Sequence, residues 1–177
     1  VLILGAGTGN DVDIALREGV QRIDAVEIDP VILEIGRNRH PGRPYDSPSV
    51  NVINADARSY LNDTNEKYDL IVFATLDSMT RLSALSNVRL DNFVYTQESL
   101  ELARSHLTSD GGIVMYFLVA SESIHLRLYG LLAETFGAVP YFDADHHKVF
   151  NRIFVAGPAF DHLTDRDADR KMSFYRE

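Results

Sequence analysis

The feature that most constrains the fold is a regular alternation of short apolar runs with segments of helical pattern. Short apolar runs bounded by glycine or polar residues predict buried strands. We expect strands at residues 1–4, 23–28, 50–54, 70–74, 113–119, 139–142 and 152–156, and helices at residues 10–18, from 29–30 onward, 57–61, 97–107 and 121–136. Strands that alternate with helices form a mostly parallel sheet, because each crossover places a helix on one of its faces. The chain is therefore predicted to be an α/β protein with a doubly wound, mostly parallel seven-stranded sheet and helices on both faces.

Length and charge narrow the classes of function. With 177 residues the chain is expected to form one domain over residues 1–160, followed by a polar tail over residues 161–177. The formal net charge of −9 argues against a nucleic-acid-binding face, which needs clustered Lys and Arg. The absence of cysteine excludes disulfides and thiolate chemistry, and no histidine spacing predicts a metal site. The longest apolar run, residues 113–120, is too short for a bilayer, so no membrane segment is predicted in this chain.

Glycines at alternate positions follow the first predicted strand. Gly5, Gly7 and Gly9 allow a tight turn and a close approach of a ligand to the backbone, although a merely sharp turn would also use them. The spacing is G-x-G-x-G, whereas the dinucleotide fingerprint is G-x-G-x-x-G. Asp11 and Asp13 then lie in the first turn of the next helix, where they would repel a pyrophosphate. These features favour a nucleoside without phosphates.

Acidic residues follow the next two predicted strands. Glu27 ends the second strand, where a carboxylate can accept hydrogen bonds from both hydroxyls of a ribose; the alternative is an exposed acid at a strand end. Asp29 is assigned to the cap of the next helix. Asp56 follows the third strand and either accepts from the exocyclic amine of adenine, with Ala57 flat against the ring, or caps a helix. Ile28 is placed in the same cofactor site.

The motifs that carry these residues resemble a known family. The runs VLILGAGTGND, VEIDP, NADA, YDLIVF and LTSDGGIVMYF resemble class I S-adenosylmethionine-dependent transferases, which have a Rossmann-like sheet. VEIDP and the irregular segment HPGRPYDSPSV are most similar to the spermidine synthase branch. The resemblance covers residues 1–157 and implies S-adenosylmethionine or its decarboxylated form as cofactor. It implies these contacts: Gly5, Gly7, Thr8 and Gly9 against the cofactor, Glu27 on its ribose and Asp56 on its adenine. It also implies that the last strand runs antiparallel.

The chain departs from the family pattern where the chemistry takes place. Spermidine synthases carry an aspartate in the glycine loop that holds the aminopropyl ammonium, and the matching residue here is Thr8. They carry D-S-S-D-P after the fourth strand, where the first aspartate deprotonates the attacking amine; that position is Ala74, and the second aspartate is Asp77. Asp77 opens a long segment, residues 76–95, of the kind that forms lids and binding loops. It is the candidate base, with a turn cap as the alternative. Tyr95 is placed against the substrate, with core packing as the alternative.

Three functions remain open at this stage. The first is an S-adenosylmethionine-dependent transferase that methylates a small-molecule acceptor. The second is an aminopropyltransferase of polyamine synthesis that uses the decarboxylated cofactor and an amine. The third is a non-catalytic nucleoside-binding domain. We expect a cytoplasmic location, or that of the cytoplasmic domain of a membrane-attached protein with its membrane segment upstream, because residues 76–98 are similar to such spermidine-synthase-like domains. The resemblance also implies a homodimer.

Overall fold

The computed structural model describes residues 1–74, 76, 94–118, 122–138, 140–144 and 151–163. Its strands are β1 (Leu2–Leu4), β2 (Ile23–Glu27), β3 (Val50–Asn54), β4 (Tyr68–Phe73), β5 (Leu107–Leu118), β6 (Tyr141–Ala144) and β7 (Asn151–Ala156). Its α-helices are α1 (Asn10–Arg17), α2 (Pro30–Arg39), α3 (Ala57–Asp63), α5 (Gln97–Ser105) and α6 (Glu122–Phe136), and its short 3₁₀ helices are η1 (Pro44–Asp46) and η2 (Pro158–Phe160).

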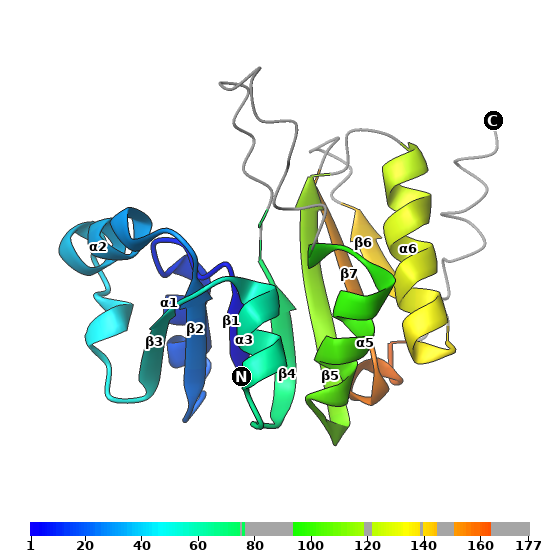
Figure 1. Cartoon of the computed structure of the whole chain (residues 1–177), viewed down its shortest axis with the longest axis horizontal. Helices are drawn as coiled ribbons and strands as arrows, with labels where there is room; N and C mark the ends of the chain where they lie inside the picture. The colour runs from blue at the N-terminus through cyan, green and yellow to red at the C-terminus, as the bar shows by residue number, and fades with distance from the viewer. Residues whose placement is uncertain (75, 77–93, 119–121, 139, 145–150, 164–177) are drawn as a thin grey trace.

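The seven strands form one sheet in the order β3-β2-β1-β4-β5-β7-β6 (Figure 1). The pairs from β3 to β5 are parallel, whereas β7 runs antiparallel to both β5 and β6. This arrangement confirms the predicted doubly wound seven-stranded sheet and its antiparallel last strand. The carboxyl ends of β3, β2, β1 and β4 consequently lie in this order along one edge of the sheet.

Helices cover the sheet in two layers, and successive strand residues pack alternately into them. Leu2 and Leu4 of β1 belong to a core cluster with buried residues of α3, α5 and α6. Ile3, between them, belongs to a second cluster with Val12 of α1 and Leu33 of α2. The strands are apolar on both sides because both sides are covered. The glycine-rich segment after β1 is thereby fixed between the sheet and the layer of α1 and α2.

Three predicted strands differ from the observed ones by two residues or more at one or both limits. β4 begins at Tyr68 instead of residue 70. β5 begins at Leu107 instead of residue 113, because Tyr68 of β4 already pairs with Leu107 before an irregularity in the ladder. The sequence predicts that Gly111 and Gly112 turn the chain into the fifth strand, but both residues lie within β5. A Cβ on Gly111 would lie 3.0 Å from the Tyr68 carbonyl oxygen, so glycine permits a close backbone approach. β6 is displaced by two residues toward the C-terminus relative to the predicted strand at 139–142.

Two other expectations concern segments that the structure does not describe in full. Most of the long segment after β4, including Asp77, lies outside the described residues, and so do residues 164–177 of the predicted tail. No described helix combines the length and the apolar character needed to cross a membrane.

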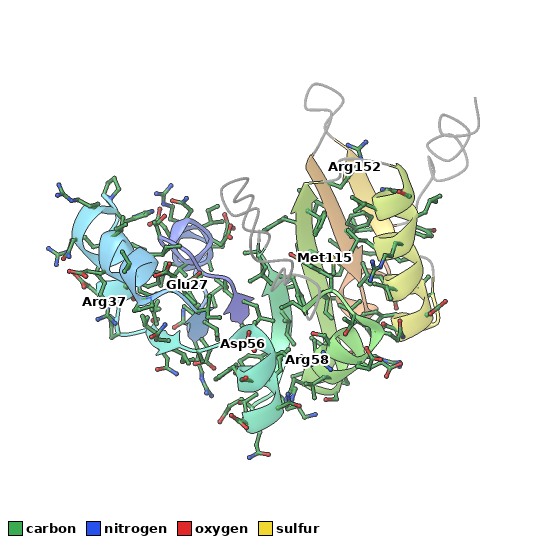
Figure 2. The ribbon with its side chains drawn as sticks, turned by 45° about the horizontal axis from the view of Figure 1, so that its top comes forward. Glu27, Arg37, Asp56, Arg58, Met115 and Arg152 are labelled. Carbon is green, nitrogen blue, oxygen red and sulfur yellow. The ribbon has the colours of Figure 1, made fainter. Side chains whose placement is uncertain are left out.

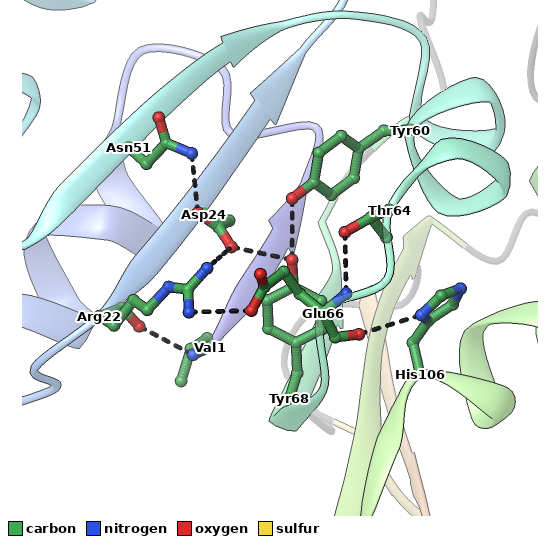
Figure 3. Close-up of polar contacts among 9 residues, drawn as sticks. All are labelled: Val1, Arg22, Asp24, Asn51, Tyr60, Thr64, Glu66, Tyr68 and His106. Carbon is green, nitrogen blue, oxygen red and sulfur yellow. Dashed lines mark hydrogen bonds and ion pairs between the residues drawn. The ribbon is translucent and has the colours of Figure 1, made fainter.

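A polar network closes the edge of the sheet where β2 and β4 begin (Figure 3). Asp24 is 1% exposed and accepts hydrogen bonds from Asn51 Nδ2 at 2.9 Å and from the Tyr68 hydroxyl at 2.8 Å. Arg22 lies 3.6 Å from the same carboxylate and 2.9 Å from Glu66. The buried charge is thus well partnered, as buried charges must be. Because Asp24 lies near the start of β2 and Glu27 ends this strand, this network and the predicted nucleoside site lie at opposite edges of the sheet.

Candidate functional site

The glycine loop after β1 has a conformation that side chains disfavour. Gly5, Gly7 and Gly9 all have positive φ, at 78°, 57° and 98°. The N–H groups of Gly5 and Ala6 donate to the Val26 carbonyl at 2.8 and 2.9 Å, which fixes the loop to the end of β2. Among the residues that the structure describes, a Cβ on Gly7 would meet only the Gly5 carbonyl oxygen, at 3.8 Å. The backbone at Gly7 is therefore open to a close approach, as the sequence predicted for this loop.

Glu27 joins the end of β2 to the glycine loop. Its side chain is buried at 7% exposure, with Oε2 accepting from the Gly7 N–H at 2.9 Å and Oε1 from the Asp29 N–H at 2.9 Å. Each carboxylate oxygen has a second lone pair, so both can still accept a hydroxyl hydrogen. The carboxylate is thus held in one orientation beside the loop, and it is not a freely exposed acid at a strand end.

The residues around Glu27 fix the same strand end. Asp29 caps α2 by accepting from the Val31 N–H at 2.8 Å, which confirms its assignment to the cap. Asn54, which the sequence analysis did not assign to the site, donates through Nδ2 to the carbonyls of Glu27 at 2.8 Å and Ile28 at 3.0 Å. Ile28 is 47% exposed, so an apolar side chain remains uncovered directly beside the carboxylate.

Asp56 follows β3 at the same edge as Glu27 (Figure 2). It caps α3, with Oδ1 accepting from the Ser59 N–H at 2.9 Å. The helix cap, the alternative to adenine binding, is therefore present. A carboxylate that caps a helix through one oxygen keeps acceptor capacity on the other. Ala57 is buried at 7% exposure and packs into the core. Contacts of Asp56 and Ala57 with an adenine stay predictions.

Tyr45 of η1 is a further residue of this region that the sequence analysis did not identify. Its hydroxyl donates to the Gly7 carbonyl at 2.7 Å, and its ring is buried. A Cβ on Gly36 of α2 would lie 2.7 Å from both the Tyr45 ring and the Thr8 carbonyl oxygen. Gly36 is the sequence signal from which this contact could have been found, because a glycine inside a predicted helix indicates close packing or function.

The positions at which the chain departs from spermidine synthases are neutral. Thr8 lies within the glycine loop, and Ala74 is buried at the end of β4. Tyr95 is also buried; its ring contacts Phe117 edge-on at 4.9 Å between centroids, and its hydroxyl donates to the Ala74 carbonyl at 3.3 Å. Tyr95 therefore packs in the core, as the alternative interpretation predicts, and its contact with a substrate stays a prediction. The role of Asp77 also stays a prediction.

Negative charge gathers around the glycine loop. Asp11 is half-buried in the first turn of α1, and among the described residues no hydrogen bond or ion pair reaches its carboxylate. Burial accordingly raises the pKa of the Asp11 carboxyl. Burial also raises the pKa of Tyr45, and the charges of Glu27 and Asp11 raise it further, whereas Arg37 lowers it. The electrostatics of this edge therefore favour a cationic ligand.

These residues fit an adenosyl sulfonium cofactor. The open backbone at Gly7 and the oriented carboxylate of Glu27 suit a ribose. The exposed Ile28 suits an apolar ring face, and the half-buried carboxylate of Asp11 suits a cation. When bound, such a cofactor supplies a carbon activated by the neighbouring sulfonium.

Solved structures share the fold. Human methyltransferase-like protein 13 in complex with SAH aligns with a TM-score of 0.71 and 22% identity over 99% of this chain and 79% of that one. Spermidine synthase from Thermotoga maritima aligns with a TM-score of 0.70 and 17% identity over 99% of this chain and 59% of that one. At these identities the likeness concerns the fold alone.

Sequence comparison is more specific. The polyamine aminopropyltransferase of Korarchaeum cryptofilum is 28% identical over 177 residues, which cover 91% of this chain and 51% of the relative. The chain thus spans about half the length of this relative. The model of the spermine/spermidine synthase domain matches residues 1–133, which include the glycine loop, Glu27 and Asp56. This chain therefore belongs to the spermine/spermidine synthase domain family.

Proposed function

We propose that the chain forms the adenosine-binding part of an aminopropyltransferase, which transfers the aminopropyl group of decarboxylated S-adenosylmethionine to an amine of the polyamine class. The observation that carries the proposal is the hydrogen bond between Glu27 and the Gly7 N–H, which joins a ribose-type acceptor to an open glycine loop. The relatives support the choice of reaction, because those with matching sequences are named polyamine aminopropyltransferase. These names do not support methyl transfer, the first expectation from the sequence.

We infer the direction in which the cofactor would extend from the order of the strands. Asp56, Glu27 and the glycine loop follow β3, β2 and β1, which are neighbours along the edge. An adenine at Asp56 and a ribose at Glu27 would direct the rest of the cofactor across the loop toward β4. The group to be transferred would then lie near α1 and the end of β4, the strand that Asp77 follows in the sequence.

Charge favours the decarboxylated cofactor. Asp13 pairs with Arg17 and lies close to Gly42, so its carboxylate already has a cationic partner on its side of α1. Asp11, two residues earlier, lies on the opposite flank of α1, since successive helical residues are about 100° apart. Its charge also raises the pKa of Tyr116 on β5, after the larger effect of burial. An aminopropyl ammonium would be attracted to this carboxylate, whereas the additional carboxylate of S-adenosylmethionine would be repelled.

The acceptor amine must be neutral to act as a nucleophile, so it needs a base. Ala74 is buried and cannot take a proton, which leaves Asp77 as the base that we propose from the sequence. In this proposal Glu27 and the Gly7 backbone hold the cofactor in position, and neither group has to take up the proton of the amine.

The test uses the whole protein with putrescine and each form of the cofactor, and mass spectrometry of the nucleoside product. We expect 5′-methylthioadenosine from decarboxylated S-adenosylmethionine, together with an aminopropylated amine. The Asp77→Asn variant should bind the cofactor normally and turn it over more slowly. Formation of S-adenosylhomocysteine from S-adenosylmethionine would identify a methyltransferase instead, and binding of neither form would overturn the proposal.

A further inference from the structure

Tyr45 contacts the glycine loop through its hydroxyl and can thereby fix the conformation of this loop. η1 packs against α1, α2 and β3, so the tyrosine is carried by an element that three others support. Its hydroxyl donates to the Gly7 carbonyl at 2.7 Å, while the N–H of the same glycine donates to Glu27 Oε2 at 2.9 Å. The two hydrogen bonds hold Gly7 from both of its polar groups.

The packing around the ring fixes the hydroxyl in turn. A Cβ on Gly36 would lie 2.7 Å from the Tyr45 ring, and a Cβ on Gly9 would lie 3.4 Å from it. The ring thus fills the space between α2 and the end of the glycine loop. A tyrosine hydroxyl is protonated at neutral pH, and burial raises the pKa of Tyr45 further, so this group is a donor.

Gly7 has no side chain to restrict it and lies at φ 57°, so an unsupported loop would sample other conformations. A change at Gly7 would also move the N–H that orients Glu27, the second donor to that carboxylate being Asp29. We propose that Tyr45 is a positioning residue of the adenosine site: through Gly7 it holds the Glu27 carboxylate in the orientation that receives the ribose hydroxyls. This inference rests on the function proposed above, because it takes the ligand to be an adenosine.

The Tyr45→Phe variant tests this role, because it keeps the ring and removes the hydroxyl. The ligands are 5′-methylthioadenosine and its 2′-deoxy analogue, and their dissociation constants are measured by calorimetry. We expect the variant to bind 5′-methylthioadenosine at least about fivefold more weakly, the effect of one hydrogen bond, and the deoxy analogue within about twofold of the wild type. The selectivity for the ribose hydroxyl should therefore fall.

The Tyr60→Phe variant is the matched control. Its hydroxyl contacts that of Tyr68 at 2.8 Å, at the opposite edge of the sheet, so its removal should leave both affinities unchanged. Equal losses for the two ligands in Tyr45→Phe would show a general packing effect and overturn the inference, as would no loss for either. A wild-type protein that binds neither ligand would instead overturn the proposed function itself.

Discussion

At the scale of single residues, Asp11 shows how this site differs from an ordinary helix terminus. Acidic residues in the first turn of a helix are usually stabilising, because they face the positive end of its dipole. For Asp11, burial raises the pKa and no described cation compensates the charge. The environment therefore disfavours the ionised form, as expected of a group retained for binding.

The Asp11→Asn variant should consequently be at least as stable as the wild type at pH 7. A carboxyl with a raised pKa in the folded state is destabilising where it is ionised, and this penalty disappears as the pH falls through that pKa. We expect a higher midpoint of thermal unfolding for the variant at pH 7 and a smaller difference at pH 3.5. Asp13→Asn is the control and should lose stability, because Asp13 pairs with Arg17. A clear loss of stability in Asp11→Asn at pH 7 would contradict the account.

The capping role of Asp29 and the position of Glu27 at the end of a strand were predicted correctly, because a local rule determines each of them. Asp29 precedes a proline that can occupy only the first helical turn, so its capping role follows from the dipeptide. The position of Glu27 follows from the strand that it ends. Tyr45 and Asn54 were missed, since their contacts with Gly7 and Ile28 join residues 38 and 26 positions apart, and no local pattern encodes such a distance.

At the scale of elements, α2 is held against the glycine loop by the absence of a side chain at Gly36. Replacing a glycine in a helix with alanine usually stabilises a protein by about 0.5–1 kcal/mol, because glycine loses more backbone entropy on folding. Here the new Cβ would lie 2.7 Å from the Thr8 carbonyl oxygen, a backbone atom that cannot yield cheaply. At this position the substitution of glycine by alanine should therefore lower the stability of the protein instead of raising it.

We therefore expect Gly36→Ala to destabilise the protein by about 1–3 kcal/mol, the range of overpacked sites, and to weaken nucleoside binding. Urea unfolding and calorimetry measure the two effects. Gly130→Ala on α6 is the matched control. In the part of the chain that the structure describes, its Cβ would meet no atom within 4 Å, so this variant should gain stability. Equal changes in stability for the two variants would show that α2 and the glycine loop are not closely packed at Gly36.

Elements were easier to predict than their limits. The periodic pattern of buried strands and amphipathic helices is a property of each segment, and it correctly predicted seven strands in a mostly parallel sheet. The antiparallel direction of β7 was predicted only from the family resemblance. The start of β5 was missed because Gly111 and Gly112 resemble a turn in the sequence, while the structure uses them for the close approach of β4 and η2. A glycine alone does not distinguish a turn from a tight contact.

At the scale of the whole molecule, the proposed binding residues and a buried polar network lie at opposite edges of the sheet. The edge where the parallel strands end carries Glu27 and the glycine loop, and the opposite edge carries the network around Asp24. Burial and the hydrogen bonds with Tyr60 and Asp24 raise the pKa of Tyr68, so its hydroxyl stays a donor to this buried carboxylate. Stability and binding should therefore be separable by mutation.

The Tyr68→Phe variant tests this separation. It removes a hydrogen bond to a buried carboxylate, at 2.8 Å, which should cost about 1.5–3 kcal/mol of the free energy of unfolding. Urea unfolding should show this loss, while the affinity for 5′-methylthioadenosine of the folded protein stays unchanged. An altered affinity would mean that the two edges are coupled, contrary to the account.

The central claim is that Glu27 binds the ribose of an adenosine at the carboxyl edge of the sheet, and one titration tests it most directly. Calorimetry with 5′-methylthioadenosine compares the wild type with Glu27→Gln and with Asp29→Asn, a control that keeps a good helix cap two residues away. The account predicts a wild-type dissociation constant below about 1 mM, a loss of at least about tenfold in Glu27→Gln and no change in Asp29→Asn. An unchanged affinity in Glu27→Gln would contradict it.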